Sequence, residues 1–153
     1  MVGTALALAD HPDQWQALKR GDTGIDTAVE EMLRWTTPAL QSGRTATTDT
    51  EVGGRPIGAG DVVTVWNASA NRDERVFDEP DRLRLDRTPN KHVTFAYGPH
   101  FCLGAYLARA EIGAVLAGLR ETVAELERTG PTRPVYSNFL SGLSSLPLAL
   151  KGE

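Results

Sequence analysis

Residues 95–104 read FAYGPHFCLG, and this stretch contains Cys102, the only cysteine of the chain. It lies directly before an alanine-rich helical pattern, where free N–H groups and the helix dipole favour an anion and therefore a thiolate. Gly98 and Gly104 flank the cysteine and allow unusual backbone angles and the close approach of a flat group. We therefore expect an exposed sulfur that meets a ligand. A buried, inert cysteine is the open alternative, because free cysteines often pack in cores as small apolar side chains.

A single exposed cysteine suits few kinds of site. Zinc and iron–sulfur sites need several ligands of this type, whereas axial ligation of haem needs only one thiolate. A cysteine nucleophile needs a nearby base. His100 lies two residues before Cys102, but this spacing is not the usual geometry, and no acid stands at a suitable spacing to orient the pair. The pattern therefore favours haem ligation over a nucleophilic cysteine.

Composition and charge limit the classes of protein to which the chain can belong. Its 153 residues fit one modest domain or part of a larger one, and 41% hydrophobic and 24% charged residues are ordinary for a globular protein. The net charge of −4 gives no sign of nucleic acid or an anionic membrane as partner. One cysteine excludes an internal disulfide. The opening MVGTALALA lacks a basic segment and is too short to span a bilayer, so we predict a cytoplasmic protein without membrane anchor.

Periodicity predicts a mainly α-helical fold with small antiparallel β-sheets. Apolar residues repeat at helical spacing in three segments near the N-terminus and in one long segment that follows the cysteine. These helices are expected over residues 1–10, 11–20, 26–36 and about 103–127. Threonines and valines between glycine-rich turns predict a small sheet over residues 43–65. Residues 67–94 show little periodicity, which indicates a functional segment or one packed against something large.

Two further polar features lie outside the cysteine loop. Glu31 and Arg34 are three residues apart in EEMLR, so they face the same side of a helix and can pair. Exposed pairs of this kind are common and contribute little. The helix is apolar on most other sides, however, so a partly buried pair is the alternative. Arg44 is either an ordinary surface residue or a planar, two-pronged ligand of a carboxylate, and nothing local decides between these readings.

Taken together, these segments resemble the C-terminal portion of a bacterial cytochrome P-450, a haem-thiolate monooxygenase. FAYGPHFCLG matches the family's pattern Phe-x-x-Gly-x-x-x-Cys-x-Gly at Phe95, Gly98, Cys102 and Gly104. EMLR matches the family's Glu-x-x-Arg pair in the expected order and distance, AYLARAEI resembles its proximal helix, and ANRDERVFDEPDRLRLDR resembles the meander before the cysteine loop. The resemblance covers essentially all of residues 1–153 and implies an incomplete fold, the C-terminal haem-thiolate portion of the domain.

The resemblance implies a haem site. Cys102 would be the axial thiolate on the iron of haem b, with Phe95 packed beside the sulfur and the porphyrin. Gly98 and Gly104 would let backbone amides approach the sulfur and tune its potential. Two more residues match the positions that bind the haem propionates: His100 and Arg44.

The resemblance also implies roles away from the haem. Glu31 and Arg34 would form a structural pair that binds the meander, through Arg72 or its neighbours, and would not be a catalytic dyad. Three apolar residues would line the substrate side: Ala39, Leu40 and Leu140.

The chain departs from the family at its N-terminus. A complete member is much longer, and its long central helix carries an acidic residue and a threonine that deliver protons to bound oxygen. By its distance from HPDQ, Met1 falls within that helix just after the expected threonine, so Thr4 is not expected to be that residue. We therefore name no catalytic residue. The isolated chain is expected to expose one face of a haem site and a large apolar surface, and to be poorly active.

The implied function is that of the haem-binding portion of a monooxygenase, which inserts one oxygen atom of O2 into a small organic substrate. Electrons would come from a ferredoxin-type donor and its reductase. The donor would dock near the cysteine loop, where Lys91, His92 and Arg109 could meet an acidic ferredoxin. A polypeptide that supplies the missing N-terminal half is a further expected partner. The alternative is a non-catalytic haem-binding or interaction fragment without the oxygen-activating helix.

Overall fold

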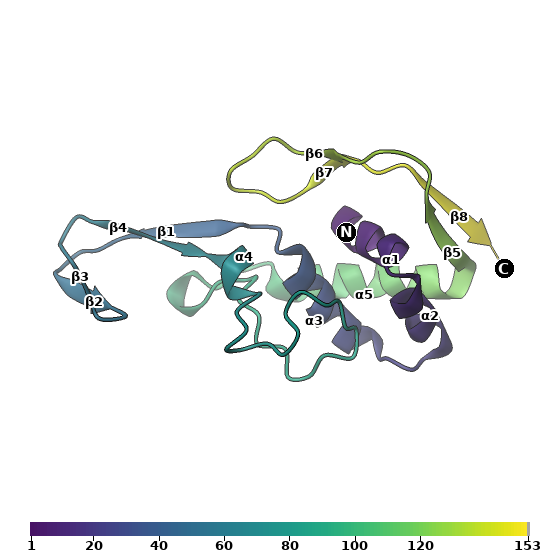
Figure 1. Ribbon diagram of the computed structural model, residues 1–153, viewed down its shortest axis with the longest axis horizontal. Helices are drawn as coiled ribbons and strands as arrows, with labels where there is room; N and C mark the ends of the chain where they lie inside the picture. The colour runs from purple at the N-terminus through teal and green to yellow at the C-terminus, as the bar shows by residue number, and fades with distance from the viewer. Residues whose placement is uncertain (153) are drawn as a thin grey trace.

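The computed structural model describes residues 1–152, and α-helices form its centre (Figure 1). Helix α5 runs along the long axis of the molecule, and α2 and α3 pack against it. The helices are α1 (Val2–Asp10), α2 (Pro12–Arg20), α3 (Ile25–Thr36), the single turn α4 (Asn67–Ala70) and α5 (Ala105–Thr122). In the described part of the chain, no helix has both the length and the apolar character needed to cross a membrane.

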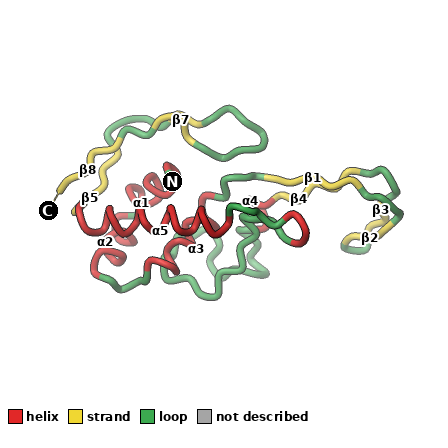
Figure 2. The backbone as a smooth tube through the Cα atoms, turned by 180° about the vertical axis from the view of Figure 1, so that it is seen from behind, coloured by secondary structure: helices red, strands yellow, loops and turns green. Residues whose placement is uncertain are grey.

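The strands pair as small antiparallel ladders, as predicted. These are β1 (Gln41–Thr45) with β4 (Val62–Trp66), β2 (Thr50–Val52) with β3 (Arg55–Ile57), β5 (Val123–Arg128) with β8 (Leu148–Gly152), and β6 (Arg133–Pro134) with β7 (Leu143–Ser145). Figure 2 shows the β1–β4 ladder extending away from the helices, with β2 and β3 at its far tip. Gly53 and Gly54 both have positive φ, 57° and 78°, which a two-residue hairpin turn requires.

One apolar core lies where the helices meet β5. The apolar stripe predicted for the segment 26–36 faces this core on α3. Four helices each contribute a side chain with no exposed surface: Leu8, Leu18, Met32 and Leu116. Leu83 and Leu85 of the irregular segment complete the core, so this segment is packed although it lacks regular structure.

The helix after the cysteine loop is shorter than predicted. α5 ends at Thr122, and residues Val123–Arg128, predicted as helix to about residue 127, form strand β5. β5 pairs with β8, which places Leu126 opposite Leu150. The partner strand lies near the C-terminus, so local periodicity does not reveal the pairing that overrides the helical pattern.

Large apolar side chains are exposed on several parts of the surface. Two of these parts are β4 and the cysteine loop with the first turn of α5. The exposed side chains of these two parts are Val62, Val65, Trp66, Tyr97, Phe101, Leu103, Tyr106 and Leu107. Leu103 is 100% exposed and Tyr97 90%, so apolar surface is uncovered beside the cysteine, as the sequence predicts.

Candidate functional site

The cysteine loop is closed by its own backbone. The Cys102 amide donates to the Phe95 carbonyl at 3.0 Å, which joins the two ends of the loop. Between them, a single 3₁₀ turn, η1 (Gly98–His100), reverses the chain. Gly98 has φ of 76° and Ala96 has φ of 60°. The left-handed conformation suits the glycine and strains the alanine.

Cys102 is exposed, which excludes a buried, inert cysteine. Helix α5 starts three residues later, and the Ala105 amide donates to the Cys102 carbonyl at 3.2 Å. A Cβ atom at Gly104 would lie 3.8 Å from the Cys102 sulfur. The glycine therefore leaves space beside the sulfur that any other residue would partly fill.

The surroundings of Cys102 do not offer other cysteine chemistry. Within residues 1–152, no group of three or more His, Cys, Asp or Glu side chains is placed to hold a metal ion. His100 is exposed, and none of the hydrogen bonds among these residues joins it to Cys102. The arrangement therefore suits a ligand that needs one thiolate and an open approach.

The Glu31 carboxylate is the centre of a buried polar network. Arg34 donates to both of its oxygens, from Nε to Oε2 at 2.7 Å and from Nη2 to Oε1 at 2.8 Å. Both side chains are 0% exposed, so the pair is buried rather than solvated. Arg34 Nη1 also donates to the carbonyls of Asn71 and Pro80, each at 2.8 Å. The predicted pairing with the meander is thus present.

The meander arginine that reaches Glu31 is Arg87. The contact expected through Arg72 or its neighbours is made by the neighbour Asn71, whose carbonyl accepts from Arg34, and not by Arg72 itself. Arg87 Nε donates to Glu31 Oε2 at 3.1 Å from a side chain that is 5% exposed. Arg72 lies instead with its guanidinium 4.3 Å from the centre of the Trp35 ring. Asn90 also donates to Glu31 Oε2, at 3.0 Å. The meander carries several arginines without periodicity, so no sequence signal separates Arg87 from the others.

Glu30, the residue before Glu31, binds one arginine and one histidine and was missed in the sequence. Arg109 of α5 donates to its two oxygens at 2.6 Å and 2.9 Å, and His92 Nε2 lies 3.0 Å from Oε2. The Arg109 hydrogen bond holds the pKa of Glu30 below its usual range. Burial lowers the pKa of His92, because the loss of hydration outweighs the attraction of Glu30. The predicted docking face of Lys91, His92 and Arg109 is therefore wrong for His92, whose side chain is 3% exposed.

The two residues predicted for the propionates are both accessible. Arg44 is exposed on β1, where its Nη1 donates to the Gly43 carbonyl at 2.7 Å. His100 is exposed in η1. Among the described residues, no carboxylate pairs with either side chain, so both can receive an anionic group from outside.

The residues predicted to line the substrate side lie together although they are far apart in sequence. Ala39 and Leu140 form an isolated antiparallel bridge. The Leu40 amide donates to the Phe139 carbonyl, and the Ser141 amide donates to the Pro38 carbonyl, each at 2.8 Å. Leu140 is 49% exposed. The tail is thereby fixed to the segment that links α3 to β1.

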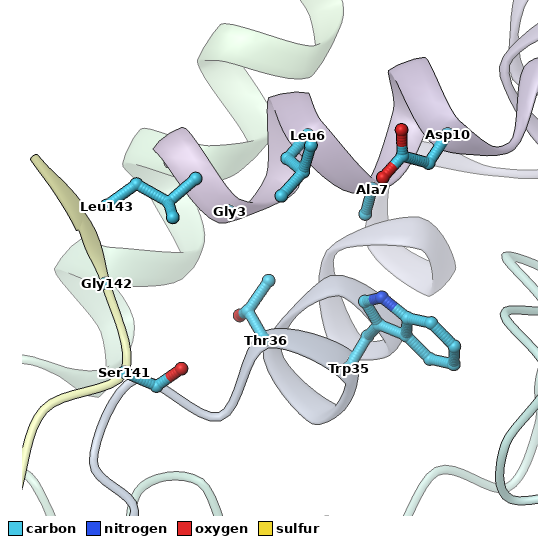
Figure 3. Close-up of a pocket in the computed structure, with 9 residues that line it drawn as sticks. All are labelled: Gly3, Leu6, Ala7, Asp10, Trp35, Thr36, Ser141, Gly142 and Leu143. Atoms are coloured by element: carbon cyan, nitrogen blue, oxygen red, sulfur yellow. The ribbon is translucent and has the colours of Figure 1, made fainter. Parts of the chain in front are cut away.

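A cleft of about 230 Å³ lies between α1, α3 and the start of β7 (Figure 3). Leu6, Trp35, Thr36 and Leu143 are among the residues that line it. No residue of the cysteine loop belongs to its lining. The cleft is therefore separate from the candidate site at Cys102.

Comparison with known proteins finds relatives along the whole chain. The sequence profile of the cytochrome P-450 family matches residues 24–122. The cytochrome P-450 NovI of Streptomyces niveus is 59% identical over 152 residues, which are 99% of this chain and 37% of that protein. Linalool 8-monooxygenase of Pseudomonas putida is 42% identical, over 96% of this chain and 36% of that protein.

Solved structures agree with the sequence matches. The structure of P-450 OxyD, which is involved in the biosynthesis of vancomycin-type antibiotics, has a TM-score of 0.94 and 39% identity, over 99% of this chain and 39% of that chain. A cytochrome P-450 from Novosphingobium aromaticivorans has the same TM-score and identity, over 38% of its chain. The present chain thus spans little more than a third of the length of the relatives it matches.

Replacing Arg87 by methionine tests the buried network. The change removes one partner of a buried carboxylate, and we expect the free energy of unfolding to fall by about 3–5 kcal/mol. Arg72→Met is the matched control. Its side chain is 35% exposed, so we expect a loss of about 1 kcal/mol. Urea unfolding of the purified chain measures both, and equal losses would contradict the assignment of Arg87.

Acidification should lower the stability of the protein through His92. The unfolded chain binds a proton at His92 near pH 6.5, whereas burial keeps the folded ring neutral to lower pH. Stability is therefore complete above about pH 6.5 and declines below it, by at most about 1.4 kcal/mol per pH unit for this group. Urea unfolding between about pH 7 and pH 5 should show a smaller decline for His92→Gln, and an unchanged decline for the exposed control His100→Gln. Equal slopes for wild type and His92→Gln would exclude this role.

Proposed function

This chain belongs to the cytochrome P-450 family, and on that premise we propose that Cys102 is the axial thiolate ligand of a haem b iron. The observation that carries the proposal is the exposed Cys102 sulfur in a loop closed by the Cys102–Phe95 hydrogen bond. Gly104 keeps the space beside the sulfur open. The exposed apolar side chains around it suit a flat, apolar macrocycle.

The chain's own residues suit the periphery of the haem as well. Arg44 and His100 are exposed and have no carboxylate partner among the described residues, so they are available to the haem propionates. Phe95 is partly buried against the core, and its carbonyl holds the Cys102 backbone. We propose that these residues bind and orient the haem, and that Gly98 and Gly104 admit backbone amides to the sulfur.

The reaction proposed is the insertion of one oxygen atom of O2 into a small organic substrate. When bound, the haem supplies an iron that activates O2, and electron donation from a thiolate ligand favours cleavage of the O–O bond. The segment around the bridge of Ala39 with Leu140 would line the substrate side, next to Leu40. No residue of this chain is proposed to transfer protons to oxygen.

The proposed activity belongs to a longer polypeptide, because this chain spans about 37% of its relative NovI. Oxygen activation needs a site from which water is excluded, whereas the apolar side chains beside Cys102 are open to solvent. We therefore propose that the chain alone is a poor monooxygenase. The alternative is a non-catalytic haem-binding or interaction fragment, which the exposed apolar surface also favours.

A spectrum of the reduced, carbon-monoxide-bound protein tests the ligand. We expect the purified chain reconstituted with haem to show the band of a thiolate-ligated iron, and Cys102→Ala to lose it completely because no other residue of the chain supplies a thiolate. Val52→Ala is the control, since its exposed side chain belongs to β2, at the far tip of the β1–β4 ladder. An unaltered band in Cys102→Ala would show that Cys102 is not the ligand.

Turnover of the purified 153-residue chain separates an active enzyme from a binding fragment. With a ferredoxin, its reductase and reduced nicotinamide supplied, we expect reducing equivalents to be consumed without coupling to substrate, because water reaches the site. Product formation and oxygen uptake are measured together. Steady, substrate-dependent product formation that matches oxygen uptake would refute the proposal of poor activity.

We propose that a ferredoxin-type donor approaches the face of the cysteine loop, and that Lys91 guides it. Arg109 is unsuitable for this role because its charge is matched by Glu30. We expect Lys91→Glu to slow haem reduction by the ferredoxin at low salt and to weaken its salt dependence. The control is Lys151→Glu, on β8 at the other end of α5 (Figure 1). Identical salt dependence in wild type and Lys91→Glu would exclude this face.

A further inference from the structure

The ring of Phe95 is held from several directions. The Arg109 guanidinium carbon lies 4.7 Å from the ring centre, within the range of a cation–π contact. The rings of His92 and Phe101 meet it edge-on, with centres 6.1 Å and 6.3 Å away. The carbonyl of the same residue accepts the amide hydrogen of Cys102. Phe95 thus connects the side chains around its ring to the backbone of the cysteine.

One carboxylate holds two of these neighbours in place. Glu30 accepts two hydrogen bonds from Arg109 and faces Nε2 of His92. The two-pronged contact sets the plane of the Arg109 guanidinium, which would otherwise turn freely on a long side chain. We call Glu30, His92 and Arg109 the Glu30 clamp.

The hydrogen bonds of His92 define its orientation. The Thr94 amide donates to Nδ1 at 3.3 Å, so the proton of the neutral ring lies on Nε2, which faces Glu30. Thr94 is itself fixed, because its hydroxyl donates to the Leu33 carbonyl at 2.9 Å and accepts from Asn71 Nδ2 at 2.9 Å. The clamp is therefore anchored on the core helix α3 and on the irregular segment.

The cysteine loop needs such support. Ala96, directly after Phe95, has φ of 60°, a conformation that an alanine adopts only when its surroundings impose it. The Tyr97 side chain beyond it is exposed and restrains the loop little, whereas Phe101 meets the Phe95 ring. The restraint on the Cys102 side of the loop comes from Phe95.

We propose that the Glu30 clamp fixes the Phe95 ring and, through the Phe95 carbonyl, the backbone position of Cys102. Its members are positioning residues, because none of them contacts the sulfur. The consequence for haem rests on the function proposed above, in which Cys102 is the ligand, whereas the consequence for the loop does not. When a residue that orients a metal ligand in this indirect way is substituted, metal affinity typically falls about 10- to 100-fold.

The first test uses the chain without haem. Amide hydrogen exchange, resolved by NMR, reports opening of the hydrogen bond from Cys102 to Phe95. We expect Glu30→Gln and Arg109→Met to raise the exchange rate of the Cys102 amide about 5- to 30-fold. The matched control is Glu111→Gln, an exposed carboxylate on α5, which should leave the rate unchanged.

A double-mutant cycle separates clamping from a general loss of stability. If the clamp acts through the ring, Arg109→Met should have no further effect on Cys102 exchange once Phe95→Leu has removed the ring. Arg109→Lys keeps a cation but loses the two-pronged contact, so its exchange rate should lie between those of wild type and Arg109→Met. This variant keeps the test decisive if the methionine variant does not fold. Additive effects in the cycle, or unchanged exchange in Glu30→Gln and Arg109→Lys, would overturn the proposal.

The second test adds haem and separates the clamp from the ligand assignment. We expect Glu30→Gln to bind haem about 10- to 100-fold more weakly and to give a smaller thiolate fraction in the reduced, carbon-monoxide-bound spectrum. A wild-type chain without a thiolate band, combined with faster Cys102 exchange in the variants, refutes the ligand and supports the clamp. A normal thiolate band and normal haem affinity in Glu30→Gln refute the consequence for haem and leave the ligand intact, while the exchange rates decide the effect of the clamp on the loop.

Discussion

The buried carboxylate of Glu31 is the constraint around which this structure is arranged. A charge without exposed surface must be matched by donors on all sides, and Glu31 receives them from Arg34, Arg87, Asn90 and the amide of Arg84. Three of these partners belong to the irregular segment after α4. That segment has almost no regular structure, and its hydrogen bonds to Glu31, together with Leu83 and Leu85 in the core, hold it in place.

Two neighbouring residues of α3, Glu30 and Glu31, bind different parts of the molecule. Successive residues of an α-helix point about 100° apart, so Glu31 faces the irregular segment while Glu30 faces α5 and the residues before the cysteine loop. Asn71 joins the two systems, since its carbonyl accepts from Arg34 while its side chain donates to Thr94 and accepts from the Val93 amide. A single turn of helix therefore determines where two long loops lie relative to the core.

On the two sides of the cysteine loop, this chain pairs its buried charges but leaves apolar side chains exposed. The buried charges of Glu31, Arg34 and Arg87, behind the cysteine loop, find their partners inside residues 1–152. The apolar side chains in front of it, among them Tyr97, Leu103 and Tyr106, are exposed. Buried charges left unpaired cost far more than exposed apolar groups. The scaffold behind Cys102 can thus be complete in a chain whose front face needs haem and further polypeptide to cover it, as our proposed function requires.

Features that depend on near neighbours in the chain could be predicted from the amino-acid sequence. These include the cysteine loop with its glycines, the apolar stripe of α3, the pairing of Glu31 with Arg34 and the hairpins between residues 43 and 65. Three features become visible only in the folded molecule: Arg87 reaches Glu31, His92 is buried against Glu30, and α5 is followed by a strand that begins at Val123. Each of these outcomes depends on a partner far away in sequence, and neither periodicity nor spacing records which distant group folding will bring into contact.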